Sequence, residues 1–332
     1  MEFIDSFFID PLIGKFIYPD KVATALSGGC DSMALTLLMN EWCKKHSINL
    51  TALIVDHKLR SESTIEANEV KNKMDNLGID CKILTYKGII PKSNIEEIAR
   101  NYRYDLIINF CKTNKINFVA MGHNKNEQIE TFLLNLIRGS GVYGLCGIPE
   151  TIKKDGVTFF RPLLNHSKDD LKNICKQHNQ TWVEDPSNQD DKYLRVRVRK
   201  LHDTFLSLGL NDDRICKTIE NMKTAREAIN SSVHIMLGKC LINKFDKLKI
   251  IEIDLNVLLS APDEIIYRVL EKYMCWFSDA EHSHIRSDIL RNIIYNLKIS
   301  LKTKIFNVKM AAGNKLKLIN INGKSVLQIA KV

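Results

Sequence analysis

The sequence predicts a doubly wound α/β domain built on a parallel sheet, followed by a second, smaller α+β domain. Short apolar segments rich in β-branched residues alternate with segments of helical periodicity through the first half of the 332-residue chain. Nearly continuous hydrophobic runs are typical of parallel strands covered by helices on both faces. Near residue 205 this pattern gives way to helices and then to short strands joined by glycine turns. We therefore expect domains at residues 1–205 and 206–332.

Strands and helices are expected to alternate in the first domain. The strands are predicted at 22–26, 50–55, 81–86 and 118–121, and each is followed by a predicted helix, at 32–46, 63–77, 93–111 and 127–137. Ser63 with Glu66, and Ser93 with Glu96, have the spacing of a capping box at a helix start. Residues 138–156 contain five glycines and a proline, so we expect a loop or lid there. A strand at 159–164 and a helix at 167–178 extend the sheet domain.

The second domain is expected to be mainly helical, with short strands at its end. Helices are predicted at 215–237, 261–276 and 283–297, and strands at 250–255, 304–309, 315–321 and 325–329. Trp182 and Trp276 are large apolar side chains, which we expect to be buried in cores rather than stacked on bases.

Composition narrows the class of protein. No run approaches the roughly 18 apolar residues of a membrane span, and the acidic N-terminus lacks the basic start of a secretory signal. We therefore expect a cytoplasmic protein. None of the nine cysteines forms a C-x-x-C pair, which argues against a disulfide framework, a zinc ribbon and an iron–sulfur site and favours buried thiols. The formal net charge of +9 suits a polyanionic partner such as a nucleic acid.

The strongest local signal is a Ser-Gly-Gly-Cys-Asp-Ser segment between the first predicted strand and its helix. Glycines let backbone amides approach phosphate oxygens without an intervening Cβ, and the start of the next helix adds its positive dipole end. Asp31 can hold a Mg²⁺ ion that bridges phosphates. The pattern G-x-x-x-x-G-K-[ST] is absent. The sequence therefore predicts a nucleotide loop of another kind, made of Ser27, Gly28, Gly29, Cys30, Asp31 and Ser32.

This loop resembles the S-G-G-x-D-S signature of the PP-loop ATP pyrophosphatases. Further segments resemble the tRNA(Ile)-lysidine synthase family in particular, in family order over residues 20–200. They are Val-Asp-His-Lys-Leu-Arg at 55–60, Asn-Ile-Glu-Glu-Ile-Ala-Arg-Asn-Tyr-Arg-Tyr at 94–104, Gly-His at 122–123 with Gln128, Glu130 and Thr131, Arg-Gly-Ser-Gly at 138–141, Arg-Pro-Leu-Leu at 161–164, and Glu-Asp-Pro-Ser-Asn at 184–188.

The resemblance implies a PP-loop fold of the adenine nucleotide α-hydrolase type and an ATP-dependent carbon–nitrogen ligase. Enzymes of this family adenylate C2 of the wobble cytidine in tRNA(Ile) with a CAU anticodon, and free lysine then displaces AMP. The products are lysidine, AMP and pyrophosphate, and the modified tRNA reads AUA codons. The second domain would dock the tRNA. The oligomeric state is left open, and a homodimer is compatible with the sequence.

The resemblance also implies a role for individual residues. Catalysis is expected from Asp31, Arg100, Glu127 and Arg199. ATP is expected to contact the loop together with Val55, Asp56 and His123, with Mg²⁺ on Asp31. Contacts to tRNA or to the substrate are expected from Arg103, Arg138, Gly139, Ser140, Gly141 and Arg195.

Three positions depart from the family pattern. Asn124 and Asn126 replace a histidine and an aspartate, which leaves Glu127 as the remaining carboxylate of a pair, and Val196 replaces an asparagine. Glu127 could orient the lysine amine or simply cap a helix below Asn124, and we favour the first role. The sequence leaves open whether His57 is structural.

Several roles have alternatives at this point. Arg195 and Arg199 are spaced i, i+4, so on a helix they share a face that could serve catalysis or contact the tRNA backbone. Two other functions remain. One is a PP-loop tRNA thiolase, although thiolases that resemble the two-thiocytidine type use paired cysteines. The other is a tRNA-binding protein that has lost catalysis, which the three departures suggest.

Overall fold

The computed structural model describes residues 2–9, 14–58, 63–86, 95–183, 194–276, 285–303, 309–311 and 313–332. The chain forms two compact units, Met1–Met222 and Lys223–Val332. The division falls inside helix α10 (Asp212–Cys240), whose early residues pack in the first unit and whose later residues pack in the second. No helix among the described residues has the length and the hydrophobicity needed to cross a membrane.

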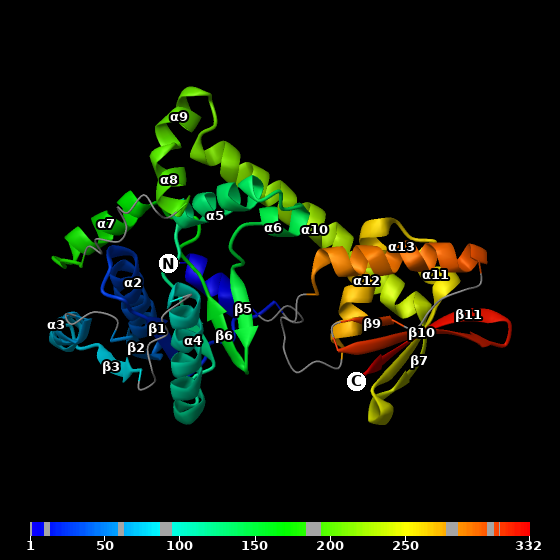
Figure 1. The fold of residues 1–332 in the computed structure, drawn as a ribbon. Coiled ribbons are helices and arrows are strands. Elements are labelled where there is room, and N and C mark those ends of the chain that lie inside the picture. The colour runs from blue at the N-terminus through cyan, green and yellow to red at the C-terminus, as the bar shows by residue number, and fades with distance from the viewer. Residues whose placement is uncertain are drawn as a thin grey trace. The chain divides into compact units, whose positions relative to one another are not determined.

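A six-stranded sheet forms the centre of the first unit, with the strand order β3-β2-β1-β4-β6-β5 (Figure 1). The strands are β1 (Lys21–Ala25), β2 (Asn49–Asp56), β3 (Asp80–Thr85), β4 (Phe118–Ala120), β5 (Thr151–Lys154) and β6 (Val157–Phe160). All neighbours pair in parallel except β5, an antiparallel edge strand. The chain moves outward from β1 to β3 and then crosses back to β4. Beyond the carboxyl ends of β1 and β4, the reversal of strand order leaves a crevice where ligands bind in such sheets.

Helices cover both faces of this sheet, because alternate strand residues point to opposite sides. Val22 packs with α2 (Cys30–His46), α3 (Ser63–Asn76) and α7 (Lys168–Gln177) on one face. Its neighbour Ala23 packs with α4 (Ile95–Asn114) on the other. The remaining helices of this unit are α1 (Glu2–Asp5), α5 (Lys125–Ile137), α6 (Val142–Leu145), α8 (Leu194–Lys200) and α9 (His202–Ser207), with a 3-10 turn at Ser6–Phe8.

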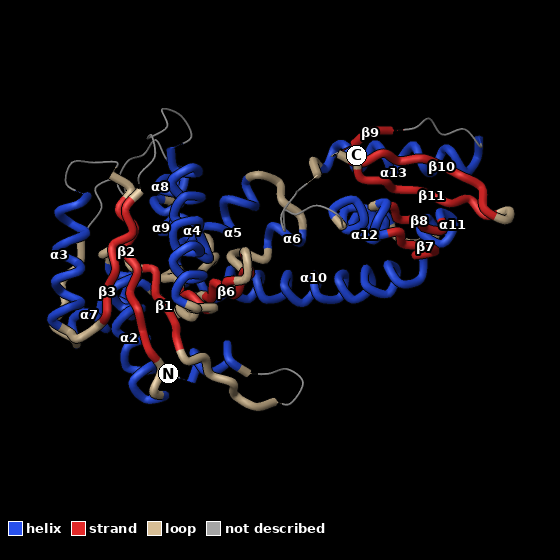
Figure 2. The backbone as a smooth tube through the Cα atoms, turned by 90° about the horizontal axis from the view of Figure 1, so that it is seen from below, coloured by secondary structure: helices blue, strands red, loops and turns tan. Residues whose placement is uncertain are grey.

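The second unit is an antiparallel sheet with the strand order β7-β8-β11-β10-β9 and helices packed against it (Figure 2). Its elements are β7 (Leu241–Phe245), a 3-10 turn (Asp246–Leu248), β8 (Ile250–Asp254), α11 (Leu255–Leu259), α12 (Asp263–Cys275), α13 (Ser287–Thr303), β9 (Lys309–Ala311), β10 (Asn314–Ile321) and β11 (Lys324–Lys331). Ile251, Ile253 and Leu327 from the strands share one core with residues of the helices.

The predicted fold class is confirmed: a mostly parallel sheet covered on both faces precedes a smaller unit of helices and strands. Residues 138–156, where we expected a loop or lid, contain the short helix α6 and the edge strand β5, which the sequence did not predict. These short elements form by pairing with β6 and packing on α5, which local composition does not reveal. Residues 184–188, and most of the strand expected at 304–309, lie outside the described residues.

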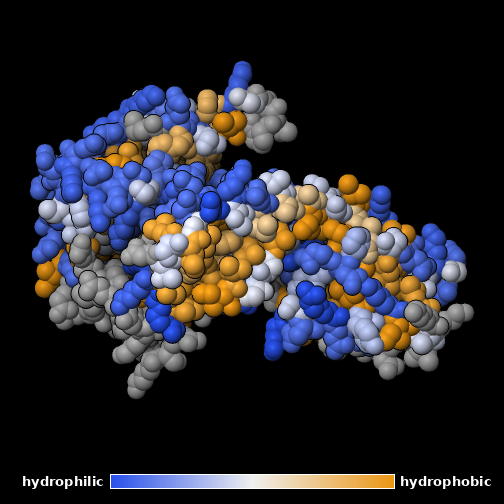
Figure 3. All heavy atoms as spheres, turned by 90° about the horizontal axis from the view of Figure 1, so that it is seen from above, coloured by the Kyte–Doolittle hydropathy of each residue, from blue (hydrophilic) through white to orange (hydrophobic). Residues whose placement is uncertain are grey.

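The expected burial of the cysteine thiols is confirmed for seven of the nine, and the other two are half-buried. Trp182 packs against the core of the first unit. The expected burial of Trp276 was wrong, because this residue, which follows α12, is 45% exposed. The Nζ atom of Lys244 lies over its ring, 5.0 Å from the ring centre. Other apolar side chains are exposed as well, and Figure 3 shows hydrophobic residues among hydrophilic ones on one face of the molecule.

Candidate active site

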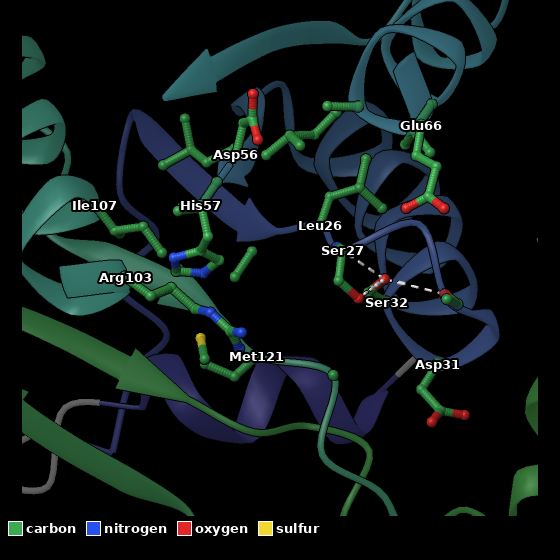
Figure 4. Close-up of a pocket in the computed structure, with 18 of the residues that line it drawn as sticks. Leu26, Ser27, Asp31, Ser32, Asp56, His57, Glu66, Arg103, Ile107 and Met121 are labelled. Atoms are coloured by element: carbon green, nitrogen blue, oxygen red, sulfur yellow. Dashed lines mark hydrogen bonds between the residues drawn. The ribbon is translucent and has the colours of Figure 1, made fainter. Parts of the chain in front are cut away.

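A cavity of 440 Å³ lies beyond the carboxyl ends of β1, β2 and β4, where the reversal of strand order predicts a ligand site. Figure 4 shows its walls. The apolar wall comes from the strands and from α3 and α4, with Ala25, Val55, Ala67, Val70, Ile107 and Met121. The polar wall comes from the strand ends and the helix starts, with Ser27, Asp31, Ser32, Asp56, His57, Arg103, His123 and Glu127. An apolar slot beside a polar strip suits a nucleotide, which has a flat base and charged phosphates.

The loop after β1 is held in shape by its own side chains. Gly28 has a φ of +84°, and a Cβ there would lie 2.7 Å from Cγ2 of Val70. The Ser27 amide donates to Oγ of Ser32 at 3.1 Å, and the Ser32 hydroxyl donates to the Gly29 carbonyl at 3.0 Å. The two serine hydroxyls are 3.1 Å apart. These contacts fix the conformation of the loop without the help of a ligand.

Gly122 brings the end of β4 against this loop. A Cβ at Gly122 would lie 3.1 Å from the backbone nitrogen of Ser32 and 3.2 Å from the carbonyl carbon of Asp31. Cys30, the first residue of α2, is buried, and its carbonyl accepts a weak bond from the Cys175 thiol at 3.5 Å. The first turn of α2, which carries unpaired amides, is thus packed by backbone on one side and by α7 on the other.

Asp31 and Glu127 form a pair of carboxylates at the polar wall. Burial raises the pKa of Asp31, although Lys168 and a hydrogen bond with Asn124 act in the opposite direction. Its Oδ1 is buried and has no hydrogen-bond partner among the described residues. Because Mg²⁺ is usually held by one or two carboxylates together with substrate phosphates, this free oxygen fits a magnesium ligand.

Glu127 has both of the roles that the sequence left open. Its backbone amide donates to Oδ1 of Asn124 at 3.0 Å, and its Oε2 accepts from the backbone amide of Asn124 at 3.3 Å, which is a complete capping box. It also lines the cavity. Burial, and then the negative charge of Asp31, raise the pKa of Glu127 to about 7. A capping carboxylate is usually ionised, whereas this one exchanges its proton near neutral pH.

Asp56 fastens the loop after β2. Its Oδ1 accepts from the Lys58 amide and from the Ser63 hydroxyl, both at 2.9 Å, and its Oδ2 accepts from the Thr64 hydroxyl at 2.7 Å. Burial tends to raise the pKa of Asp56, but these hydrogen bonds outweigh it and the pKa is lowered. The Ser63 hydroxyl therefore helps to hold the Asp56 carboxylate in place. Residues Leu59 and Arg60 of this motif lie outside the described residues.

Two histidines and an arginine also line the cavity. Arg103 of α4 and His57 face the same part of the cavity (Figure 4). Burial lowers the pKa of His57, and Arg103 lowers it further. Burial also lowers the pKa of His123 to about 3, helped by Arg161 and Arg100. Both imidazoles are therefore neutral at physiological pH, while the arginines supply the positive charge.

Arg195 and Arg199 share a face of α8, as their i, i+4 spacing predicts, and both point at Glu130 of α5. The Arg199 Nε donates to Glu130 Oε1 at 2.8 Å, and the Arg195 Nε lies 3.4 Å from Oε2. Val196, the next residue of α8, is buried. Glu130 thus fixes the direction of both guanidinium groups.

The structure brings some predicted residues together and separates others. Asp31, Ser27, Gly29, Ser32, Val55, Asp56, Arg103, His123 and Glu127 line the cavity. Arg100 lies on α4 with its guanidinium 5.7 Å from the Tyr104 ring centre, outside the lining. The segment with Arg138, Gly139, Ser140 and Gly141 joins α5 to α6 and does not line the cavity either.

Sequence reasoning assigned no role to two residues that organise the site. One is Glu130, described above. The other is Arg161, which is only 1% exposed and donates to the Pro149 carbonyl at 2.9 Å and to the Tyr104 hydroxyl at 3.4 Å. Both residues lie inside segments that resemble family motifs, and this position indicated that they could have a role. Their partners lie 12 to 69 residues away, which no local pattern shows.

The sequence comparison decides the family. A family model described as the PP-loop domain matches residues 8–203, which include every residue of the cavity wall. The chain belongs to the PP-loop family of ATP-binding domains. The Ser-Gly-Gly-Cys-Asp-Ser segment lies inside the matched range.

Curated relatives of the chain confirm the resemblance seen in its motifs. A protein of Wolbachia pipientis wMel named tRNA(Ile)-lysidine synthase is 39% identical over 255 residues, which are 76% of this chain and 59% of the relative. Proteins of the same name from Anaplasma marginale and Ruegeria pomeroyi are 35% and 31% identical, over 75% and 80% of this chain. The chain spans between 53% and 62% of the length of these PP-loop relatives.

A solved structure supports the fold of the PP-loop chain. It is the U34-tRNA thiolase NcsA from Methanococcus maripaludis with its [4Fe-4S] cluster, which superposes with a TM-score of 0.53 over 68% of this chain and 79% of that one. The two sequences are 21% identical. The likeness shows that the chain path is shared.

Replacing Gly28 with alanine tests the loop geometry. We expect Gly28→Ala to lower the stability by about 1–3 kcal/mol through backbone strain and to weaken ATP binding, because the new Cβ would meet Val70. Thermal unfolding and calorimetric titration with ATP measure the two effects. Gly156→Ala is the matched control, since Gly156 has the same φ of +84° and nothing lies near its would-be Cβ. Equal loss of ATP binding in both variants would contradict the steric argument.

Proposed function

We propose that this chain is an ATP-dependent ligase that joins free lysine to C2 of the wobble cytidine of tRNA(Ile) with a CAU anticodon. One observation carries the proposal: a PP-loop and a carboxyl group with a pKa of about 7 share one cavity. A phosphate loop alone suits any reaction of ATP. A carboxylate that exchanges protons near neutral pH suits the second half of this reaction, in which an amine must lose a proton. The names of the curated relatives support the same choice.

In the first step, the C2 carbonyl oxygen of the cytidine attacks the α-phosphorus of ATP and pyrophosphate leaves. The backbone amides of the loop and the first turn of α2 bind the phosphate oxygens. Asp31 would hold Mg²⁺, which neutralises charge on the phosphates when it is bound. Arg100 and Arg103 lie on one helix near His123, where they stabilise the negative charge that develops on the α-phosphate.

In the second step, the lysine ε-amine attacks C2 of the adenylated cytidine. A C–N bond forms, the bond from C2 to the adenylate oxygen breaks, and AMP leaves with that oxygen. Glu127 orients the amine and takes its proton, because a carboxylate with a pKa of about 7 is a stronger base than an ordinary one. Glu130 keeps Arg199 in a fixed direction beside this carboxylate.

The tRNA would be bound by positive groups around the cavity and by the second domain. The formal net charge of +9 favours contact with phosphates. Arg138 with the glycine segment that follows it, and Arg195, are exposed on the elements that carry the site. The target cytidine would leave its stack so that its C2 edge reaches the ATP. A protein that modifies tRNA in this way would act in the cytoplasm.

The decisive experiment is mass analysis of the wobble cytidine. We expect tRNA(Ile) with a CAU anticodon, incubated with the protein, ATP, Mg²⁺ and lysine, to gain the mass of lysidine and to release pyrophosphate in equal amount. Omission of lysine should prevent the gain of the lysidine mass. Sulfur incorporation would indicate a thiolase instead, and tRNA binding without pyrophosphate release would indicate a protein that has lost catalysis.

Removing the carboxylate of the loop tests the magnesium ligand. We expect Asp31→Ala to reduce pyrophosphate release by at least about 100-fold, with tRNA affinity unchanged, because Asp31 contacts the metal and not the tRNA. Asp169→Ala is the control, since that carboxylate is 88% exposed on α7. Turnover of Asp31→Ala at the normal rate would refute the role.

The pH dependence of lysine use tests Glu127. The residue must be ionised to accept a proton, so we expect the lysine-dependent step to rise with pH through about 7. In Glu127→Gln this rise should disappear and the rate should fall by about 10²–10⁴-fold, while ATP binding persists. Glutamine is itself a good residue at this position of a capping box, so the helix start is kept. An unchanged pH profile would leave Glu127 with capping alone.

A further inference from the structure

Lys168, the first residue of α7, lies beside the nucleotide loop although the α7 sequence gives no sign of a site. Its backbone amide donates to Oδ1 of Asn126 at 2.9 Å, and the Lys125 amide donates to the His166 carbonyl at 2.9 Å. These two bonds tie the start of α7 to the first turn of α5. Ser167 caps α7 together with Asp170. The backbone of Lys168 is therefore fixed next to the residues that precede Glu127.

Helix α7 is also packed on the helix that starts at the loop. Leu171 and Cys175 are fully buried in the core that contains Met33, and the Cys175 thiol donates to the carbonyl of Cys30. Two faces of α7 are thus fixed, one by α2 and one by α5. Helix α7 is therefore held against both helices whose first turns form the polar wall.

Charge effects agree with this placement. Lys168 exerts the largest effect of any positive group on Asp31, ahead of Arg199 and Lys172. Asn126 is neutral, so it holds the Lys168 backbone without neutralising the ammonium group. Within the described ranges, no carboxylate lies at ion-pair distance from that ammonium group. Lys172, one turn further along the same helix, is paired: its Nζ lies 3.7 Å from Oδ1 of Asp169.

We propose that Lys168 binds the β- and γ-phosphates of ATP and stabilises the pyrophosphate as it leaves. The inference rests on the proposed adenylation, and it adds a residue that the motifs do not assign. When the bond from the α-phosphorus to the bridging oxygen breaks, its electron pair goes to the pyrophosphate. An ammonium group carried by α7, a different helix from the α4 of Arg100 and Arg103, stabilises that charge. The two ends of the triphosphate are then held by different elements, α4 and α7.

Binding of pyrophosphate itself gives a test that needs neither tRNA nor lysine. Magnesium pyrophosphate is titrated into the purified chain in a calorimeter. We expect Lys168→Ala to weaken the affinity about tenfold, which corresponds to about 1.4 kcal/mol. Lys168→Arg should keep most of the affinity because the charge remains. Alanine is a good helix former at a helix start, and circular dichroism confirms that each variant is folded.

Lys172→Ala is the matched control, because it removes the same charge from the same helix at a position that is already paired. We expect its affinity to change less than twofold. Wild-type affinity in Lys168→Ala, or an equal loss in both alanine variants, would overturn the proposal. A loss specific to Lys168 in a protein that makes no lysidine would leave this inference standing and would reject the proposed function, so the two can fail separately.

Discussion

The loop before α2 and the end of β4 pack so closely against their neighbours that only glycine fits at two positions. The rest of the site depends on this close packing. Gly28 passes Val70 with a left-handed backbone, and Gly122 lies against the backbone of Asp31 and Ser32. A side chain at Gly28 would push the loop away from Val70 of α3, and one at Gly122 would push the end of β4 away from the first turn of α2. The amides of the loop, the carboxylate of Asp31 and the imidazole of His123 would then no longer face one cavity. Two missing Cβ atoms thus determine where the nucleotide can lie.

The same close packing explains how the site separates its charges. Asp31, Glu127 and Glu130 lie on the starts of α2 and α5, whereas Arg100, Arg103 and Arg161 come from α4 and the end of β6. Burial makes each group sensitive to its neighbours, since a low dielectric strengthens interactions between charges. It raises the pKa of Glu127 and lowers that of His123 in the same small volume. One group can therefore exchange protons at neutral pH while the other stays neutral.

The sequence predicted what depends on local pattern. Hydrophobic runs placed β1 to β4 within one or two residues, and the loop motif placed Asp31 at the start of α2. The roles of Glu130 and Arg161 were missed, because they depend on partners brought together only by the sheet order. The α6 and β5 elements were missed for the same reason. Trp276 was misjudged because hydrophobicity gives no information about which side of a short helix end faces water.

Cys30 gives the loop an unusual chemical property. Its thiol stands in the middle of a phosphate-binding segment, and burial, with Cys175 and Asp31 nearby, raises its pKa to about 12. Only the thiolate form of cysteine reacts rapidly with oxidants and alkylating agents. At neutral pH almost none of this sulfur is in that form. Cys30 can therefore stand at the centre of this loop while its sulfur reacts only slowly with oxidants and alkylating agents.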